Sequence, residues 1–178
     1  MQKRLGIGTG VVTVVFMACS LTLVILAHAK GPATSSAQKG PAMASHAIGA
    51  FEVKMTPQKP DNPIEEAAHI ARLTGDKQWH GDLEGASKLE MLATAPDAKG
   101  SGVYVALERV TGTLKGRSGT FLLHHTGIMD RGKPTLTILV APDSGTGQFT
   151  GLTGKMTINI TPDGKHSYDF EYTLPDTQ

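Results

Sequence analysis

The chain contains few of the residues on which several common functions depend. Only one of its 178 residues is cysteine, and aromatic residues make up 5%. A single cysteine excludes an internal disulfide framework and a thiolate metal cluster built within one chain. The 17 lysine and arginine residues nearly balance the 16 acidic residues. Because nucleic acid is bound by clustered positive charge, this balance argues against a nucleic-acid partner.

The N-terminus, residues 1–29, predicts a signal peptide. Lys3 and Arg4 form a short positive region, and the apolar stretch that follows ends in Ala27–Ala29, where small residues are spaced as signal peptidase requires. We therefore expect a secreted or periplasmic protein. The alternative is a membrane anchor through residues 5–29, because this uncharged stretch is long enough to cross a bilayer as a helix. The membrane is a partner only if this segment is retained.

The rest of the chain divides into a linker and one domain. Residues 30–48 are rich in alanine, serine, glycine and proline and have no period, so we expect a flexible linker. Residues 49–175 are long enough for a single closed core and form the predicted domain. Cleavage after residue 29 would remove Cys19 and leave a chain without a thiol. Such a chain cannot use a cysteine nucleophile or thiol redox chemistry.

Alternation of apolar and polar residues is the main signal in this domain. Met156, Ile158 and Ile160, for example, are separated by single polar residues. A strand places alternate side chains on opposite faces, so such segments predict half-buried strands. The predicted strands are residues 50–56, 67–75, 83–93, 102–114, 119–127, 133–141, 146–150, 154–161 and 166–174.

Short, glycine-rich connections join these strands. A G-x-x-x-G-x-x-G spacing occurs twice, from Gly112 and from Gly147, and Asp163–Gly164 is a typical hairpin pair. Glycine supplies the positive φ of tight turns and the bulges that bend a sheet. Eight or nine consecutive strands with such turns predict an all-β fold, an antiparallel eight-stranded β-barrel, whose closure leaves no exposed edge.

Three segments of this domain resemble those of a known family. They are GVYVALERVTG at residues 102–112, GRSGTFLLHHTG at residues 116–127 and PDSGTGQFTGLTG at residues 142–154. Together with Phe51, His166 and Tyr172 near the two ends, they resemble the bacterial domain of unknown function 3224 over about residues 50–175. The resemblance implies an allene oxide cyclase-like barrel of eight strands. It implies no activity, and the N-terminal export segment is a departure from many relatives.

Glu108 is the first candidate for a catalytic group. It shares one face of its predicted strand with Tyr104, Ala106 and Val110. If this face is the lumen, the carboxylate lies in an aromatic pocket, and burial would raise its pKa. The alternative is a structural glutamate that pairs with an arginine or with backbone amides near one end of the barrel.

His125 is the second candidate, because the family motif matches it. It shares a face with Phe121 and Leu123, whereas His124 points to the opposite face. His125 is either an internal acid or base or a histidine whose hydrogen bonds are satisfied in the core. No pair of histidines has the spacing of metal ligands, so we expect neither a metal nor a cofactor.

Aromatic residues and a histidine on the inward faces are the predicted ligand-binding residues. They are Tyr104, Phe121, His166, Tyr168 and Tyr172. At this spacing aromatic side chains commonly fill a core, with hydroxyl groups bonded to polar partners. The sequence alone leaves both roles open.

Three functions remain open from the sequence. The preferred one is an exported barrel that binds a small apolar molecule in its lumen, since eight strands make a barrel wide enough for one ligand. The second is a cofactor-independent isomerase or cyclase of the allene oxide cyclase type, with Glu108 as its carboxylate and His125 or Tyr104 as its donor. The third is a structural module that forms homo-oligomers through its outer face.

Overall fold

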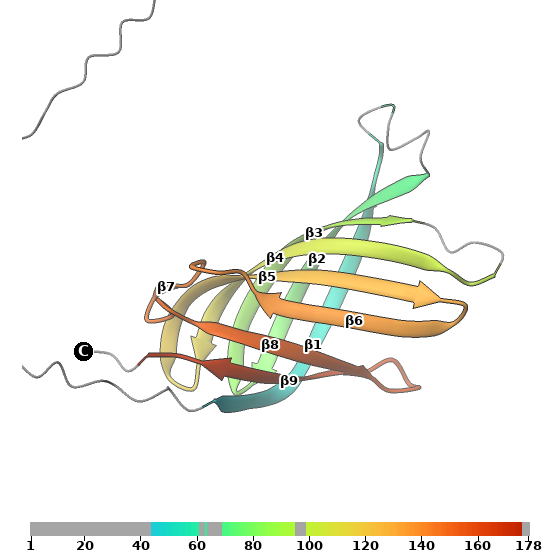
Figure 1. Ribbon diagram of the computed structural model, residues 1–178. Coiled ribbons are helices and arrows are strands. Elements are labelled where there is room, and N and C mark those ends of the chain that lie inside the picture. Colours follow the sequence, from blue (N-terminus) through green and yellow to red (C-terminus); the bar gives the residue numbers. More distant parts are fainter. Residues whose placement is uncertain (1–43, 61–62, 64–68, 95–98, 176–178) are drawn as a thin grey trace, which may run out of the picture. The chain divides into compact units, whose positions relative to one another are not determined.

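A computed structural model describes residues 44–60, 63, 69–94 and 99–175 of the chain. The predicted signal peptide and most of the predicted linker lie outside these residues. The described elements are nine strands (Figure 1). They are β1 (Ser45–Gln58), β2 (Ile70–Gly81), β3 (Leu83–Thr94), β4 (Gly102–Leu114), β5 (Arg117–Asp130), β6 (Lys133–Val140), β7 (Thr146–Gly147), β8 (Thr153–Ile160) and β9 (His166–Thr173).

Eight of these strands close into an antiparallel barrel. The hydrogen-bonded order is β4-β3-β2-β1-β9-β8-β6-β5, and a further pairing of β4 with β5 completes the ring. The short strand β7 pairs with β5 beside this ring. The predicted all-β, eight-stranded antiparallel barrel is therefore confirmed. Within the described part of the chain, there is no helix with the length and apolar character to cross a membrane.

Two strands, β1 and β2, differ most in extent from the prediction. β1 begins at Ser45, so the barrel includes the last residues of the segment predicted as a linker. Of these residues, Ser45 to Ile48, Ala47 is the one that lies fully buried. β2 runs to Gly81 rather than ending near residue 75, because the polar run that looks like a turn continues the strand. Trp79 and His80 consequently belong to β2.

Two hairpins use the turn that best matches the twist of antiparallel strands. Lys115 and Gly116 have φ values of 46° and 84° between β4 and β5. Arg131 and Gly132 have φ values of 49° and 81° between β5 and β6. Two consecutive residues with positive φ are the mark of a type I′ turn. The two turns lie at opposite ends of the barrel and serve below to name those ends.

The lumen is packed at the end near Lys115–Gly116, here called the filled end. Large side chains less than 2% exposed lie there, among them Trp79, Phe121, Phe149, Phe170, Leu83 and Leu114. The Phe121 ring stands 5.5 Å from that of Phe149 and 5.8 Å from that of Phe170. The other end, near Arg131–Gly132, carries inward-facing side chains that are partly exposed, and we call it the open end. The barrel is thus filled over one half of its length.

Candidate functional site

Four polar side chains meet inside the barrel where the filled half ends. Lys77 comes from β2, Ser87 from β3, Glu108 from β4 and His125 from β5. These strands are neighbours, and the register places Lys77 opposite Ser87 and His125 opposite Ala106, two positions before Glu108. All four side chains are buried, and Glu108 is completely so. We call this group the polar cluster.

The carboxylate of Glu108 is the centre of the polar cluster. Nζ of Lys77 donates to its Oε2 over 2.8 Å, and Oγ of Ser87 donates to its Oε1. Nε2 of His125 lies 3.0 Å from Oε2. The direction of this last contact is not that of a hydrogen bond, and no other described residue gives Nε2 one. Glu108 is therefore paired with a buried cation and is not an isolated buried acid.

The pKa of Glu108 corrects the sequence-based expectation of a raised value. Burial pushes this pKa upward, but close contact with His125, the charge of Lys77 and the Ser87 hydrogen bond together outweigh burial. The result is a pKa below the ordinary value of 4.5. Glu108 is consequently ionised at neutral pH, as favourable charges and donors around a buried carboxylate dictate. Burial and the charge of Glu108 raise the pKa of Tyr104.

Aromatic rings contact the polar cluster where the filled half of the lumen ends. The Lys77 ammonium lies 4.8 Å from the ring centre of Phe51 and 4.9 Å from that of Trp79. Such distances allow cation–π attraction, which stabilises a desolvated ammonium. Nε1 of Trp79 donates to Oγ of Ser87 over 2.9 Å. A chain of contacts therefore runs from Trp79 through Ser87 to Glu108.

A cavity of about 250 Å³ lies on the other side of the polar cluster, in the open half of the lumen. Its polar lining residues are Lys77, Tyr104, His125 and His166. Its remaining lining residues are apolar: Phe51, Val53, Met55, Leu89, Met91, Ala106, Leu136, Ile158 and Ile160. Glu108 does not line this cavity, because Lys77 and His125 lie between its carboxylate and the open half. We call this space the lumen cavity.

The structure brings together four of the seven residues predicted for the site. Glu108 and His125 are in contact within the polar cluster, and Tyr104 and His166 line the lumen cavity. Phe121, Tyr168 and Tyr172 instead belong to the packed core of the filled half. Tyr168 also has a structural role there, since its hydroxyl accepts a hydrogen bond from the backbone N–H of Leu83 over 2.9 Å.

The sequence-based prediction missed Lys77 and Ser87. Lys77 lies two residues before Trp79 and shares its face, and a charged residue on the apolar face of a strand is an informative signal. That signal was lost because the predicted strand ended near residue 75. Ser87 gave no signal, since a small hydroxyl on a strand is common and its partner Glu108 is distant in sequence.

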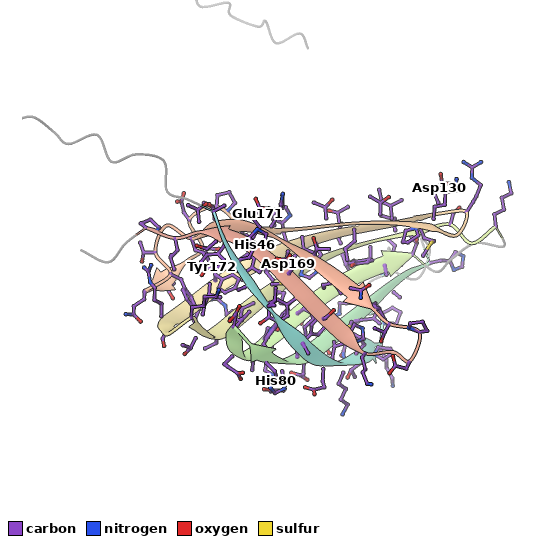
Figure 2. The ribbon with its side chains drawn as sticks, turned by 90° about the horizontal axis from the view of Figure 1, so that it is seen from below. His46, His80, Asp130, Asp169, Glu171 and Tyr172 are labelled. Carbon is purple, nitrogen blue, oxygen red and sulfur yellow. The ribbon has the colours of Figure 1, made fainter. Side chains whose placement is uncertain are left out.

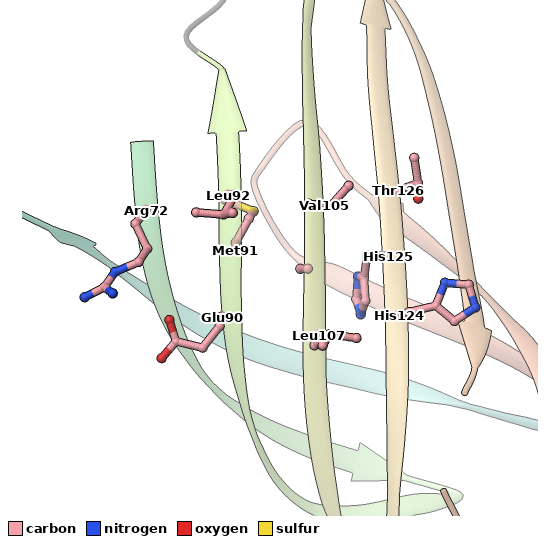
Figure 3. Close-up of a pocket in the computed structure, with 10 residues that line it drawn as sticks. Arg72, Glu90, Met91, Leu92, Val105, Leu107, His124, His125 and Thr126 are labelled. Atoms are coloured by element: carbon pink, nitrogen blue, oxygen red, sulfur yellow. The ribbon is translucent and has the colours of Figure 1, made fainter. Parts of the chain in front are cut away.

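A larger hollow, of about 540 Å³, lies on the outer side of β2 to β5 (Figure 3). Leu92, Val105, Leu107 and His124 line it, and Figure 3 shows the rings of His124 and His125 leaving β5 in different directions. His124 is thus confirmed on the opposite face from His125. Lys77, Ser87 and Glu108 are not among its lining residues, whereas Met91, Ala106 and His125 line both this hollow and the lumen cavity.

Other histidines contact carboxylates on the outer face of the barrel. Nδ1 of His46 lies 2.7 Å from Oδ1 of Asp169 and links β1 to β9, and both residues lie on the outside in Figure 2. Nε2 of His80 lies 2.9 Å from Oε2 of Glu52. Among the described residues no group of three or more His, Cys, Asp or Glu side chains is arranged to hold a metal ion.

The fold and the polar cluster together place the protein among closed antiparallel barrels whose lumen holds a buried charged network. The sequence matches a family of proteins of unknown function, DUF3224, over residues 47–172, and the chain belongs to this family. A crystal structure of a protein of unknown function from DUF3224, from Shewanella oneidensis MR-1, is 39% identical with a TM-score of 0.68, and the match covers 76% of this chain and 100% of that one. No curated protein matches the sequence.

Proposed function

We propose that the barrel binds a small, largely apolar molecule in its lumen. The observation that carries this proposal is the lumen cavity, which is lined mostly by apolar side chains, with Lys77 and His125 at its floor and Tyr104 and His166 nearer the open end. Binding sites for small molecules have this composition, since apolar walls supply affinity and a few placed polar groups fix orientation. The family description gives no competing activity.

The mouth of the cavity supports the same proposal. Met55, Leu136 and Ile160 line the cavity and are 36%, 41% and 60% exposed. When a ligand covers apolar side chains that are in contact with water, the free energy of the complex is lowered, which favours binding. An apolar molecule in the cavity would cover the exposed surface of these three side chains.

Isomerase or cyclase activity stays a prediction. The geometry of the site changes the role that Glu108 would have in it. Glu108 lies behind Lys77 and His125, so it would not touch a ligand in the lumen cavity. In a reaction it would act by holding these two side chains, and Lys77 and His125 would be the groups in contact with the reacting molecule. We therefore take binding as the function that the site supports best.

Lumen binding is tested by asking what the purified protein carries. Protein isolated as its host produces it would be examined by native mass spectrometry and by small-molecule analysis after extraction. We expect a stoichiometric apolar compound in the wild type and its loss in Ala106→Leu, which places a larger side chain in the cavity. Ala86→Leu, on the exposed outer face of β3, is the matched control. An empty wild type that no lipophilic compound stabilises against heat would contradict lumen binding.

Self-association is a second candidate function, and the outer face supports it. Five apolar side chains between 42% and 58% exposed form an outer apolar patch: Leu92, Val103, Val105, Leu107 and Ile128. The register places Leu92 opposite Val105 and Val103 opposite Ile128, so the patch is continuous over β3, β4 and β5. Continuous exposed apolar surface marks interaction sites, and a second copy of the chain is the partner that we propose.

The mass of the protein in solution tests this second candidate. Light scattering after size-exclusion chromatography, over a range of concentrations, should show a dimer that Leu107→Glu converts to a monomer. Ile48→Glu changes a side chain that is 61% exposed on β1, outside the patch, and should leave the dimer intact. A wild type that is monomeric at every concentration would exclude self-association through this face.

A further inference from the structure

The polar groups that line the lumen cavity would attract a ligand of negative charge. Lys77 brings a positive charge, His125 and His166 bring imidazoles, and Tyr104 brings a hydroxyl. No aspartate or glutamate is found among the described residues that line the cavity. A pocket selects a ligand whose charge and hydrogen-bonding groups complement its own. The lining therefore favours an acceptor group, above all an anionic one.

Lys77 is a donor at the cavity floor that is not fully used within the protein. It has several protons to donate, and its hydrogen bond to Glu108 employs one of them. Nε2 of His125 is buried 3.0 Å from Oε2 of Glu108, which leaves Nδ1 as the ring nitrogen for a ligand. Buried donors in proteins are commonly paired with acceptors, so a ligand that supplies an acceptor fits this floor.

Lys77 is the charged side chain that the cavity floor presents to a ligand. Glu108, which does not line the cavity, pairs with Lys77, and its other oxygen accepts the Ser87 hydrogen bond. The other titratable groups that line the cavity are Tyr104, His125 and His166, and β6 and β8 contribute apolar side chains. The lining therefore offers a ligand one ammonium and no carboxylate.

The size and direction of the cavity limit the rest of the ligand. A volume of about 250 Å³ is near the lower end of the range for small-molecule sites, roughly 300–1,000 Å³, so the ligand is small. The walls above the floor are mostly apolar, and Tyr104 and His166 are the polar residues near Leu136 and Ile160 at the open end. A single short hydrocarbon chain fits such a space, with its end near the exposed mouth.

Resting on the proposed lumen binding, we propose that the ligand is an amphiphile with a carboxylate head group and a medium-length hydrocarbon chain. The carboxylate lies at the floor and accepts hydrogen bonds from Lys77 and His125. The chain points toward the open end between Met55, Leu136 and Ile160. This inference defines the chemical class of the ligand, which the apolar cavity alone does not.

Matched chain compounds test the head group. Octanoate, 1-octanol and octylamine have chains of the same length, and each would be titrated into the full-length protein by calorimetry. Trp79 is the single tryptophan of the chain, and its ring contacts Lys77, so its fluorescence reports binding at the floor. We expect octanoate to bind and to change the Trp79 emission, 1-octanol to bind about tenfold or more weakly, and octylamine not to bind.

Variants separate this inference from lumen binding itself. Lys77→Met should weaken octanoate about ten- to hundredfold and 1-octanol at most about fivefold, while Lys88→Met, which removes an exposed lysine of β3, should change neither. If Lys77→Met does not fold, Lys77→Met with Glu108→Met removes both charges and takes its place. Equal binding of octanoate and 1-octanol, unaffected by these variants, would overturn the carboxylate but retain lumen binding. Failure of every compound to bind would overturn both.

Discussion

At the scale of single residues, the ion pair of Lys77 with Glu108 holds the centre of the barrel together. Lys77→Met leaves the Glu108 carboxylate buried without its cation, and removing one partner of a buried pair lowers the free energy of unfolding by about 3–5 kcal/mol. We expect a loss of this size, measured by urea denaturation. Lys88→Met breaks an exposed pair with Asp76 and should lower the unfolding free energy by less than about 1 kcal/mol.

A double variant shows how much of this loss comes from the unpaired charge. Lys77→Met with Glu108→Met removes both charges and keeps the volume of the two side chains. Apolar replacements of buried ion pairs are commonly neutral or stabilising. We therefore expect the double variant to recover at least half of the unfolding free energy that Lys77→Met loses. A double variant less stable than Lys77→Met would show that the pair itself, and not the orphaned charge, stabilises the fold.

The lowered pKa of Glu108 makes its contribution to stability dependent on pH. In the unfolded chain the carboxyl returns to its ordinary pKa of 4.5, so between the folded and unfolded values the unfolded chain binds more protons. The unfolding free energy therefore falls as the pH drops from 4.5 through the lower folded pKa. We expect the stability difference between the wild type and Glu108→Gln to be largest at neutral pH and to shrink below that window. Urea denaturation at a series of pH values measures it.

The comparison of two proteins removes the effect of other acids. Asp76 is exposed, and its hydrogen bond and ion pair with Lys88 lower its pKa in both proteins alike. Such surface groups change both unfolding curves equally and cancel in the difference. A difference that stays constant from neutral pH to pH values well below 4.5 would contradict an ionised Glu108.

At the scale of elements, the pairing of β4 with β5 depends on a close approach of Tyr104 to Gly127. The two residues are opposite each other, and a Cβ on Gly127 would lie 2.0 Å from Cε1 of the Tyr104 ring. Gly127→Ala therefore displaces the ring, and overpacking of this kind lowers the unfolding free energy by about 1–3 kcal/mol. In a Tyr104→Ala background the same substitution should be nearly neutral. Urea denaturation of the four proteins of this double-mutant cycle measures the coupling.

The strands also show which parts of the fold the sequence predicts. Alternation located β3, β4, β8 and β9 to within a residue or two, because one face of each strand is buried. It failed on β2, where Lys77 occupies an inward position in the polar run Asp76–Gln78. Contacts with Glu108, distant in sequence, and with the rings of Phe51 and Trp79 make a lysine stable there. The alternation of residues therefore predicts the limits of a strand correctly only where the polar residues of that strand face water.

At the scale of the whole molecule, the sequence predicts the barrel better than it predicts the division of its lumen. The inward faces of all strands look alike as patterns, so Phe121 and Tyr172 in the core could not be told apart from Tyr104 at the cavity. That division depends on how far along the barrel each side chain lies, which is set by the stagger of the strands. Glu108 and His125 could be predicted as a pair, because both are polar residues on faces that are otherwise apolar.

The two halves of the lumen should respond in opposite ways to a larger side chain. Ala47 is fully buried in the filled half, whereas Ala106 borders the lumen cavity. Ala47→Leu has no free volume to enter and should lower the unfolding free energy by about 1–3 kcal/mol. The larger side chain of Ala106→Leu can extend into the cavity, and burial of its apolar surface there offsets any strain. We therefore expect the unfolding free energy to change by less than about 1 kcal/mol. Urea denaturation of both variants measures the contrast. Equal destabilisation by the two substitutions would mean that the open half is as tightly packed as the filled half, and the lumen would then have no room for a ligand.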